Sequence, residues 1–483
     1  MQEEKDLKQS LGFFTTLTIV IGAVVGSGIF KKPAVMADQL GSPELLIAIW
    51  VLAGILTLFG ALTNAEIASM ITATGGQYIF FEKMYGRLFA FLYGWGLFGI
   101  IQTGSIASIT WVFAEYSQYF TSFYIPDMFS EEVIKSSMFH IPFIGNIYPL
   151  QYFGIKIITI GTILFLTLAN YFGVIFGGRI ANIFTIAKVL AILIIVFFAF
   201  FWSGSSIENF TQNASQYSFK GAGIFAGIIA ALSGAFWSYD GWNNITYIAG
   251  EVKKPQENIP KSLIFGTLII IAIYIVINLA FIYVLNVEQM AKSTIVAADV
   301  ALLSMGEVGA AFVSAAVMIS TFGTSNGTIM VSARVYYAMS KNGMFFKKIG
   351  KSHSKWKTPA NSLIWQAIWS SLLVISGTFD TLTDMLIFVS WVFYAAGAYG
   401  VFILRKKMPD IPRPYKVIGY PYIPAIFVFF ATLFVIFTLY NDIDNYVSGR
   451  SEIINSVFGL FLVAIGLPIY FYYNSKWKKA PKV

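Results

Sequence analysis

Two glycine-containing stretches interrupt apolar segments of this chain that are long enough to cross a membrane. The first, residues 22–30, contains Gly26-Ser27-Gly28, and the second, residues 233–242, contains Asp240-Gly241. Lipid cannot hydrogen-bond the N–H and C=O groups that such breaks leave free, so interrupted helices persist at membrane depth only where they line a cavity. Two interrupted spans at corresponding places in two halves of a chain indicate the substrate site of a transporter.

The first stretch has the chemistry to bind a carboxylate and an ammonium group of a substrate. Glycine permits an unwound turn at low steric cost, and the turn leaves the N–H groups of Ser27 and Gly28 at the positive end of the next half-helix, where a carboxylate fits. Carbonyl groups near Val24, at the end of the preceding half-helix, suit an ammonium group. The alternative is helix packing alone, because Gly22 and Gly26 form the GxxxG pattern of membrane helices.

The second stretch places polar and aromatic side chains within an apolar span. A charge such as that of Asp240 costs about 2.5–3.5 kcal/mol at the bilayer centre, so this side chain should face the interior of the helix bundle. It either contacts a cationic or polar part of the substrate, or is a structural carboxylate satisfied by N–H groups of its own loop. Trp237 is either a core residue or an aromatic gate over the substrate. The predicted substrate-binding residues are Val24, Gly26, Ser27, Gly28, Ile29, Trp237, Ser238 and Asp240.

Lys188 is the single charged residue of the apolar stretch 181–202. It lies roughly 12 Å inside the membrane edge at 1.5 Å per residue, and a lysine stem can snorkel over only part of that distance. We therefore expect an internal partner, formed by carbonyl groups of the first break and hydroxyl groups of the eighth helix, so that the ammonium group substitutes for a sodium ion. Pairing with Asp240 is the competing arrangement. The hydroxyl candidates are Ser320, Thr321 and Thr324.

The composition excludes several classes of protein. The 483 residues are 57% hydrophobic and 12% charged, against about 25% charged in soluble domains. Without cysteine there is neither a disulfide nor a thiolate site, and because His140 and His353 fall in expected loops, no metal, cofactor or enzyme activity is expected. The net charge of +8 has no basic soluble module to present it to nucleic acid, and no repeated filter motif indicates a channel.

Apolar runs of about 20 residues predict an all-α polytopic membrane protein with twelve transmembrane helices embedded in the lipid bilayer. Lysine and arginine concentrate in alternate loops, which predicts cytoplasmic termini, so the two interrupted helices run in opposite directions. This arrangement is typical of a LeuT-type inverted repeat of five plus five helices, which two more helices follow here. Glu66 and Glu115, near helix ends, are expected to snorkel. The expected spans are 12–36, 43–72, 87–120, 150–172, 180–202, 222–248, 262–285, 308–339, 360–378, 382–404, 420–440 and 454–473.

The expected organisation follows from these spans. It consists of a cytoplasmic segment 1–10, a first repeat 11–202, a second repeat 222–407, two further helices within 420–473, and a cytoplasmic tail 474–483.

Several motifs together resemble the amino acid–polyamine–organocation (APC) superfamily, and within it the L-type amino acid transporter branch. The resemblance extends over nearly the whole chain. The motifs are residues 22–30 with Lys31-Lys32-Pro33, 64–67 with 75–78, 239–243 continuing into 251–255 and 258–262, and 325–327 with 332–334 and 337–339.

The resemblance implies a LeuT-type fold, sodium-independent exchange of amino acids, and carboxylate binding at Ser27 and Gly28. It implies that Trp237 is the aromatic gate and that Lys188 is the lysine of helix 5 that replaces sodium. Animal light-chain relatives join a heavy chain through a cysteine in the loop that corresponds to 121–149, which has none here, so a stand-alone bacterial carrier is expected. The carbonyl groups implied in binding the substrate amine belong to Val24, Trp237, Ser238 and Asp240.

Taken together, the sequence predicts an L-amino acid exchanger of the plasma membrane that works by alternating access. Small or neutral amino acids are the expected substrates, and Asp240 adds basic ones as candidates. A proton-coupled symporter, with Lys188 or Asp240 titrating, and an amino acid sensor that moves no substrate are the alternatives. The residues expected to set selectivity are Gln102, Ser105, Asn326, Trp391 and Tyr394.

Overall fold

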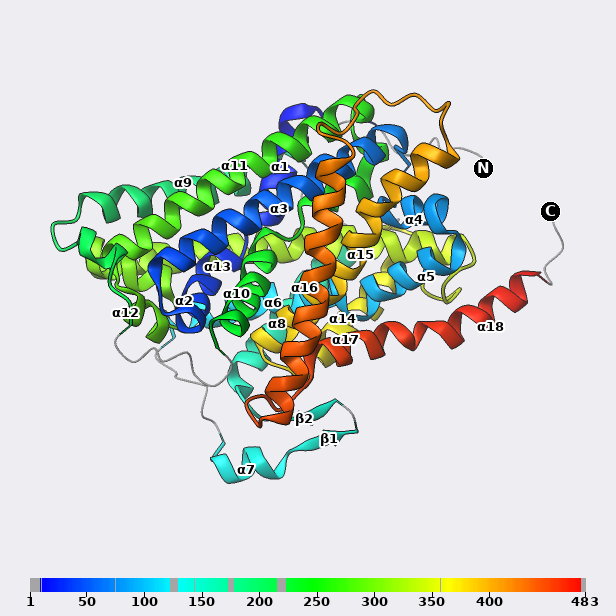
Figure 1. Cartoon of the computed structure of the whole chain (residues 1–483). Coiled ribbons are helices and arrows are strands. Elements are labelled where there is room, and N and C mark those ends of the chain that lie inside the picture. Colours follow the sequence, from blue (N-terminus) through cyan, green and yellow to red (C-terminus); the bar gives the residue numbers. More distant parts are fainter. Residues whose placement is uncertain are drawn as a thin grey trace.

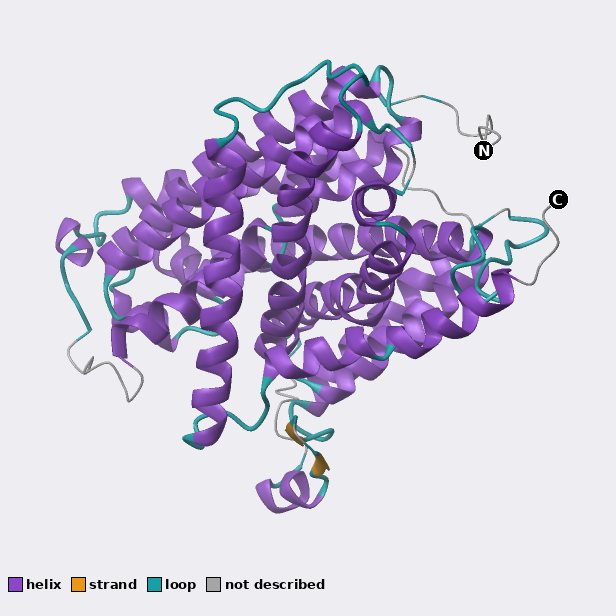
Figure 2. Ribbon diagram, turned by 45° about the vertical axis from the view of Figure 1, so that its right-hand side comes forward, coloured by secondary structure: helices purple, strands orange, loops and turns teal. Residues whose placement is uncertain are grey.

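The structure, a computed structural model, describes residues 9, 11–73, 75–121, 129–142, 144–172, 178–214, 223–356 and 358–478. Within these ranges the protein is almost entirely helical, and its one sheet is a two-stranded antiparallel hairpin of β1 (Phe139–Ile141) and β2 (Gly145–Ile147) (Figure 2). Most of the predicted segment 1–10 and the end of the tail 474–483 lie outside the described residues.

The twelve predicted spans all have helical counterparts. Eleven helices of the described ranges are long and apolar enough to cross a membrane, and a shorter apolar helix, α14 (Ala360–Ser376), is the twelfth. The uninterrupted spans are α3 (Pro43–Met70), α8 (Phe153–Tyr171), α9 (Gly178–Phe201), α11 (Pro255–Val284), α15 (Phe379–Lys407) and α16 (Tyr422–Val447). The short connecting elements are α4 (Gln77–Tyr85), α7 (Glu131–Ser136), η2 (Ile207–Phe210) and α12 (Val287–Lys292).

Both predicted breaks are present. The first span consists of α1 (Phe13–Val24) and α2 (Gly28–Leu40), and the sixth consists of α10 (Gly223–Tyr239) and the 3₁₀ helix η3 (Trp242–Glu251). The second break is shorter than the stretch 233–242, since the helix continues to Tyr239. It falls at Gly241, whose φ of 96° is a conformation that glycine adopts at little cost.

Three other spans depart from regular helices. The third contains a π-helical segment, η1 (Leu97–Ile101), between α5 (Arg87–Gly96) and α6 (Gln102–Ser117). The eighth, α13 (Val296–Lys341), begins before the predicted 308 and changes direction at Gly306, with φ 72°. The last is divided into α17 (Asn455–Ala464) and α18 (Gly466–Lys478).

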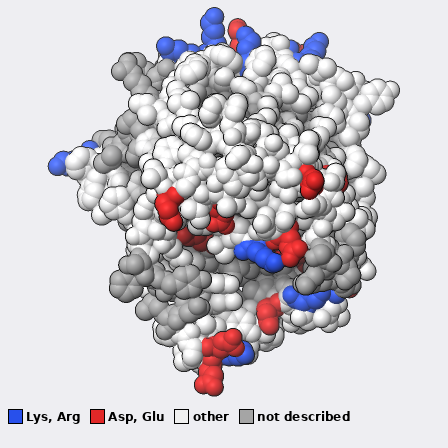
Figure 3. Space-filling view, turned by 90° about the vertical axis from the view of Figure 1, so that its left-hand side faces the viewer, with Lys and Arg blue, Asp and Glu red and all other residues white. Residues whose placement is uncertain are grey.

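The helices α1, α3 and α9 pack against α11, and α2 packs on α10 (Figure 1). The broken helices touch closely, because a Cβ atom built on Gly28 would lie 2.5 Å from the Cα of Ser238. Large apolar side chains remain exposed on the outer helices, for example Ile183 and Phe197 on α9. One face of the molecule accordingly shows mostly uncharged side chains with separate charged groups among them (Figure 3). Exposed apolar surface on membrane-length helices is suited to contact with lipid.

Candidate substrate-binding site

A cavity lies where the two breaks meet. The space between the atoms there, open solvent included, is about 340 Å³. Its walls include six of the eight predicted binding residues; Ile29 and Ser238 are not among the lining residues. The lining residues are Ala23, Val24, Gly26, Ser27, Gly28, Ser105, Ile109, Trp237, Asp240, Gly241, Asn244, Thr324 and Thr328.

The start of α2 offers hydrogen-bond donors to this cavity. Ser27 immediately precedes the helix, and the first N–H groups of any helix lack intrahelical partners. The Ser27 side chain is buried, yet its Oγ has no hydrogen-bond partner within the described part of the chain. Buried polar groups are rarely left unpaired. Orphan donors at a positive helix end therefore fit a small anion such as a carboxylate.

The end of the first half-helix and the second break share one side chain. The Tyr274 hydroxyl on α11 lies 2.9 Å from the Val24 carbonyl oxygen and 2.9 Å from that of Ser238. It thereby links two of the four carbonyl groups that were predicted to contact the substrate amine, and each oxygen keeps a second lone pair. We missed Tyr274 in the sequence, although it is the single tyrosine of the apolar run 263–282.

Lys188 on α9 reaches the first break. Its Nζ donates to the carbonyl oxygens of Gly22 (3.0 Å) and Val25 (2.9 Å), and to Oγ1 of Thr324 on α13 (2.8 Å). These three bonds use all the donors of an ammonium group. The carbonyl groups lie at the negative end of α1, where a cation is favoured.

The other two expected partners, Ser320 and Thr321, do not hydrogen-bond Lys188. Thr321 donates to carbonyls of its own helix, and Ser320 Oγ is buried without a partner in the described residues. The competing pair with Asp240 is not formed, because within the described ranges no carboxylate makes an ion pair with Lys188.

Asp240 and Trp237 both line the cavity. Asp240 Oδ1 accepts a hydrogen bond of 2.6 Å from the Tyr394 hydroxyl on α15, so the carboxylate links the second break to another helix. The Trp237 ring lies 6.3 Å from that of Phe379, and its Nε1 is buried without a partner in the described chain. The gate and carboxylate roles of these two residues remain predictions.

The residues expected to set selectivity occupy different places. Ser105 lines the cavity, whereas Tyr394 hydrogen-bonds Asp240, which is a lining residue. Asn326 Oδ1 instead accepts from Asn170 at 2.7 Å, and Trp391 packs on Phe236 with ring centroids 3.7 Å apart. Gln102, directly after the π-helical segment, contacts Ser332 and Asn244.

Glu66 does not snorkel, and this expectation was wrong. Its side chain is 1% exposed and accepts from Arg405 at 2.7 Å and from the Val417 N–H at 2.8 Å, with Arg413 nearby. Glu115 is also partly buried, and Lys31 donates to it. The partners come from residues far along the chain, which the local sequence does not reveal.

Comparison with known proteins identifies the family. A family model described as amino acid permease matches residues 11–466. The chain belongs to this family. It is therefore a mostly helical, multi-pass membrane protein with an APC-type LeuT fold, and its family consists of transporters rather than enzymes.

Three relatives of this permease illustrate the range of the family. The "Serine/threonine exchanger SteT" of Bacillus subtilis (strain 168) is 30% identical over 481 residues, 99% of both chains. The human "b(0,+)-type amino acid transporter 1" is 30% identical over 424 residues, 86% of this chain and 80% of the relative. The mouse "Large neutral amino acids transporter small subunit 2" is 28% identical over 486 residues, 99% of this chain and 83% of the relative.

Proposed function

We propose that this permease exchanges L-amino acids across the membrane by alternating access. The observation that carries the proposal is the meeting of two opposed helix breaks at one cavity. The start of α2 presents N–H groups for the substrate carboxylate, and the ends of α1 and α10 present carbonyl groups for the ammonium. A zwitterion complements both ends without any additional ion.

Lys188 supports independence from sodium. Its ammonium group occupies the negative end of α1 and bonds α9 to α1 and α13, as a bound cation would. Because this amine is covalently attached to the protein, it requires no ion gradient. Sodium should therefore leave transport unchanged.

A relative supports small or neutral amino acids as the main substrates. The name of the Bacillus subtilis exchanger refers to serine and threonine, which are small and neutral. Asp240 at the wall adds basic amino acids, since a carboxylate in a desolvated site favours a cation.

We infer a plasma-membrane location with both termini in the cytoplasm, and the division into repeats 11–202 and 222–407 and the helices of 420–473. The distribution of lysine and arginine supports the cytoplasmic termini. The broken helices that lead the two repeats support the division, and the similarity to a bacterial exchanger supports the plasma membrane. Absence of cysteine excludes a disulfide to a heavy chain.

The test is counterflow into liposomes that contain the purified protein and one unlabelled amino acid. A panel of labelled amino acids is added with and without sodium and a pH gradient. One-for-one exchange that needs internal substrate, and that neither gradient changes, supports the proposal. Uptake into empty liposomes driven by the pH gradient would replace it with proton symport, and saturable binding without flux would replace it with a sensor.

A further inference from the structure

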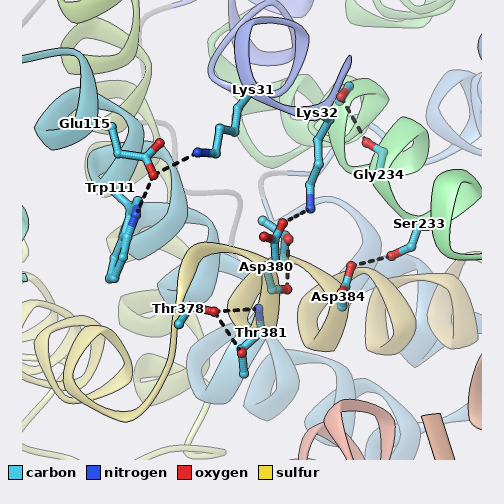
Figure 4. A network of polar contacts seen from close by, with 12 residues as sticks. Lys31, Lys32, Trp111, Glu115, Ser233, Gly234, Thr378, Asp380, Thr381 and Asp384 are labelled. Carbon is cyan, nitrogen blue, oxygen red and sulfur yellow. Dashed lines mark hydrogen bonds and ion pairs between the residues drawn. The ribbon is translucent and has the colours of Figure 1, made fainter. Parts of the chain in front are cut away.

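The two adjacent lysines Lys31 and Lys32 have no role in the site described above. They follow Gly28 by three and four residues, so they lie one turn along the half-helix whose start offers donors to the cavity. Consecutive helical residues project about 100° apart at 3.6 residues per turn. The two side chains therefore reach different neighbours, as Figure 4 shows.

Lys31 connects α2 to α6. Its Nζ donates to Glu115 Oε1 at 2.9 Å and to the Thr294 carbonyl oxygen at 3.3 Å. Trp111 donates to the same Glu115 oxygen at 3.2 Å and so fixes the carboxylate. The two charged side chains are 13% and 15% exposed, so the pair is largely shielded from water.

Lys32 connects α2 to α15. Its Nζ donates to Asp380 Oδ1 at 2.7 Å and lies 4.8 Å from the centroid of the Phe379 ring, which in turn contacts Trp237. The Lys32 side chain is 2% exposed, whereas that of Asp380 is 50% exposed. Asp380 lies in the first turn of α15, where the helix dipole stabilises a negative charge even without Lys32.

We propose that Lys31 and Lys32 form a two-armed outer gate, which must release Glu115 and Asp380 before the cavity can open to the outside. The inference rests on the alternating access and topology proposed above. The Lys32 arm is suited to reversible use, since Asp380 is already half exposed and stabilised by its helix. Both arms join α2 to helices outside the two broken spans, so movement of α2 away from them breaks both pairs.

Contacts at the opposite end of α1 differ in kind. There Leu11 N–H donates to the Glu251 carbonyl oxygen, and Lys253 N–H donates to that of Leu11. These bonds join α1 to the end of η3, and thus one broken span to the other. They do not oppose movement of both spans together. The lysine pairs, like the 3.0 Å hydrogen bond from the Tyr116 hydroxyl to the Phe30 carbonyl oxygen, join α2 to helices outside the broken spans and do oppose it.

The absence of cysteine allows a direct test by thiol labelling. Ser105→Cys places a reporter on the cavity wall, and Thr328→Cys provides a second one from another helix. A membrane-impermeant thiol reagent is applied without substrate to spheroplasts, which expose the outer face, and to inside-out vesicles. Asp380→Asn and Glu115→Gln remove one arm each, and Glu131→Gln is the matched control, because Glu131 pairs with Lys135 of its own helix.

We expect each arm variant to raise labelling from the outside about threefold or more and to lower labelling from the inside, since population gained by one state is lost by the other. The control should change neither rate. Unchanged labelling in both arm variants would overturn the gate. A rise on both faces would also overturn it, because that result indicates looser packing.

The gate and the proposed function can fail separately. Exchange in liposomes with unshifted labelling would contradict the gate alone. Shifted labelling in a protein that moves no amino acid would contradict the exchange and leave the gate in place.

Discussion

Replacement of Lys188 by methionine should weaken substrate binding while the protein remains folded. The change keeps a side chain of similar length and removes the donors that serve Gly22, Val25 and Thr324. A buried acceptor that loses its donor costs about 1–3 kcal/mol, so the two carbonyl groups together cost about 2–6 kcal/mol. This cost destabilises the conformation in which the break is closed, where water cannot replace the ammonium group.

The lower value, about 2 kcal/mol, corresponds to a roughly 30-fold increase in Kd. The assay is substrate-dependent thermal stabilisation of purified protein, together with exchange in liposomes over a range of substrate concentrations. Arginine should not rescue the variant, because its planar guanidinium differs in shape from the compact ammonium group.

Lys156→Met is a matched control. Lys156 on α8 is equally buried and also donates three hydrogen bonds, to the carbonyl oxygens of Tyr148, Pro149 and Ile375. Its loss should lower the melting temperature and leave substrate affinity unchanged. Wild-type exchange by Lys188→Met would refute the reasoning, as would an equal loss of affinity in the two variants.

Two further substitutions test separate parts of the site, and a third tests the buried ion pairs of Glu66. Ser27→Pro should abolish substrate binding because it removes the Ser27 N–H, and the φ of −74° at Ser27 already suits proline. Ser27→Ala keeps this N–H and should only weaken binding. Retained affinity in the proline variant would contradict the carboxylate site. Asp240→Asn keeps an acceptor for Tyr394 and should reduce transport of basic amino acids more than that of neutral ones; equal reductions would make the carboxylate structural. Glu66→Ala should lower the free energy of unfolding by about 3 kcal/mol, since it leaves buried cationic partners uncompensated. The expected result is a lower melting temperature with an unchanged KM. A changed KM with an unchanged melting temperature would give Glu66 a role in transport instead.

Much of the fold could be predicted because a membrane imposes simple rules on the sequence. Long apolar runs located the spans, and glycines in two of them located both breaks. The division of the third span by a π-helical segment and the early start of α13 were not predicted. Hydropathy measures how apolar a segment is, and it is insensitive to a single extra residue in a turn or to a change of direction at Gly306.

The candidate site, too, could be predicted from the sequence only in part. Lys188 was recognised because a lone charge in an apolar helix needs a partner. The first break was the partner that we expected for it. Tyr274 was missed because a tyrosine in a membrane helix is ordinary until its hydroxyl is placed between two free carbonyl groups. Glu66 was misjudged for the same reason, since its partners lie about 340 residues away in the chain.

The sequence by itself determined that this protein is a helical membrane transporter with two interrupted spans, because backbone groups in lipid must be satisfied locally. Only the tertiary structure decided which side chains satisfy those breaks and which lysines join α2 to α6 and α15. Those choices depend on distances between helices that are remote in sequence. No property of a single helix encodes them.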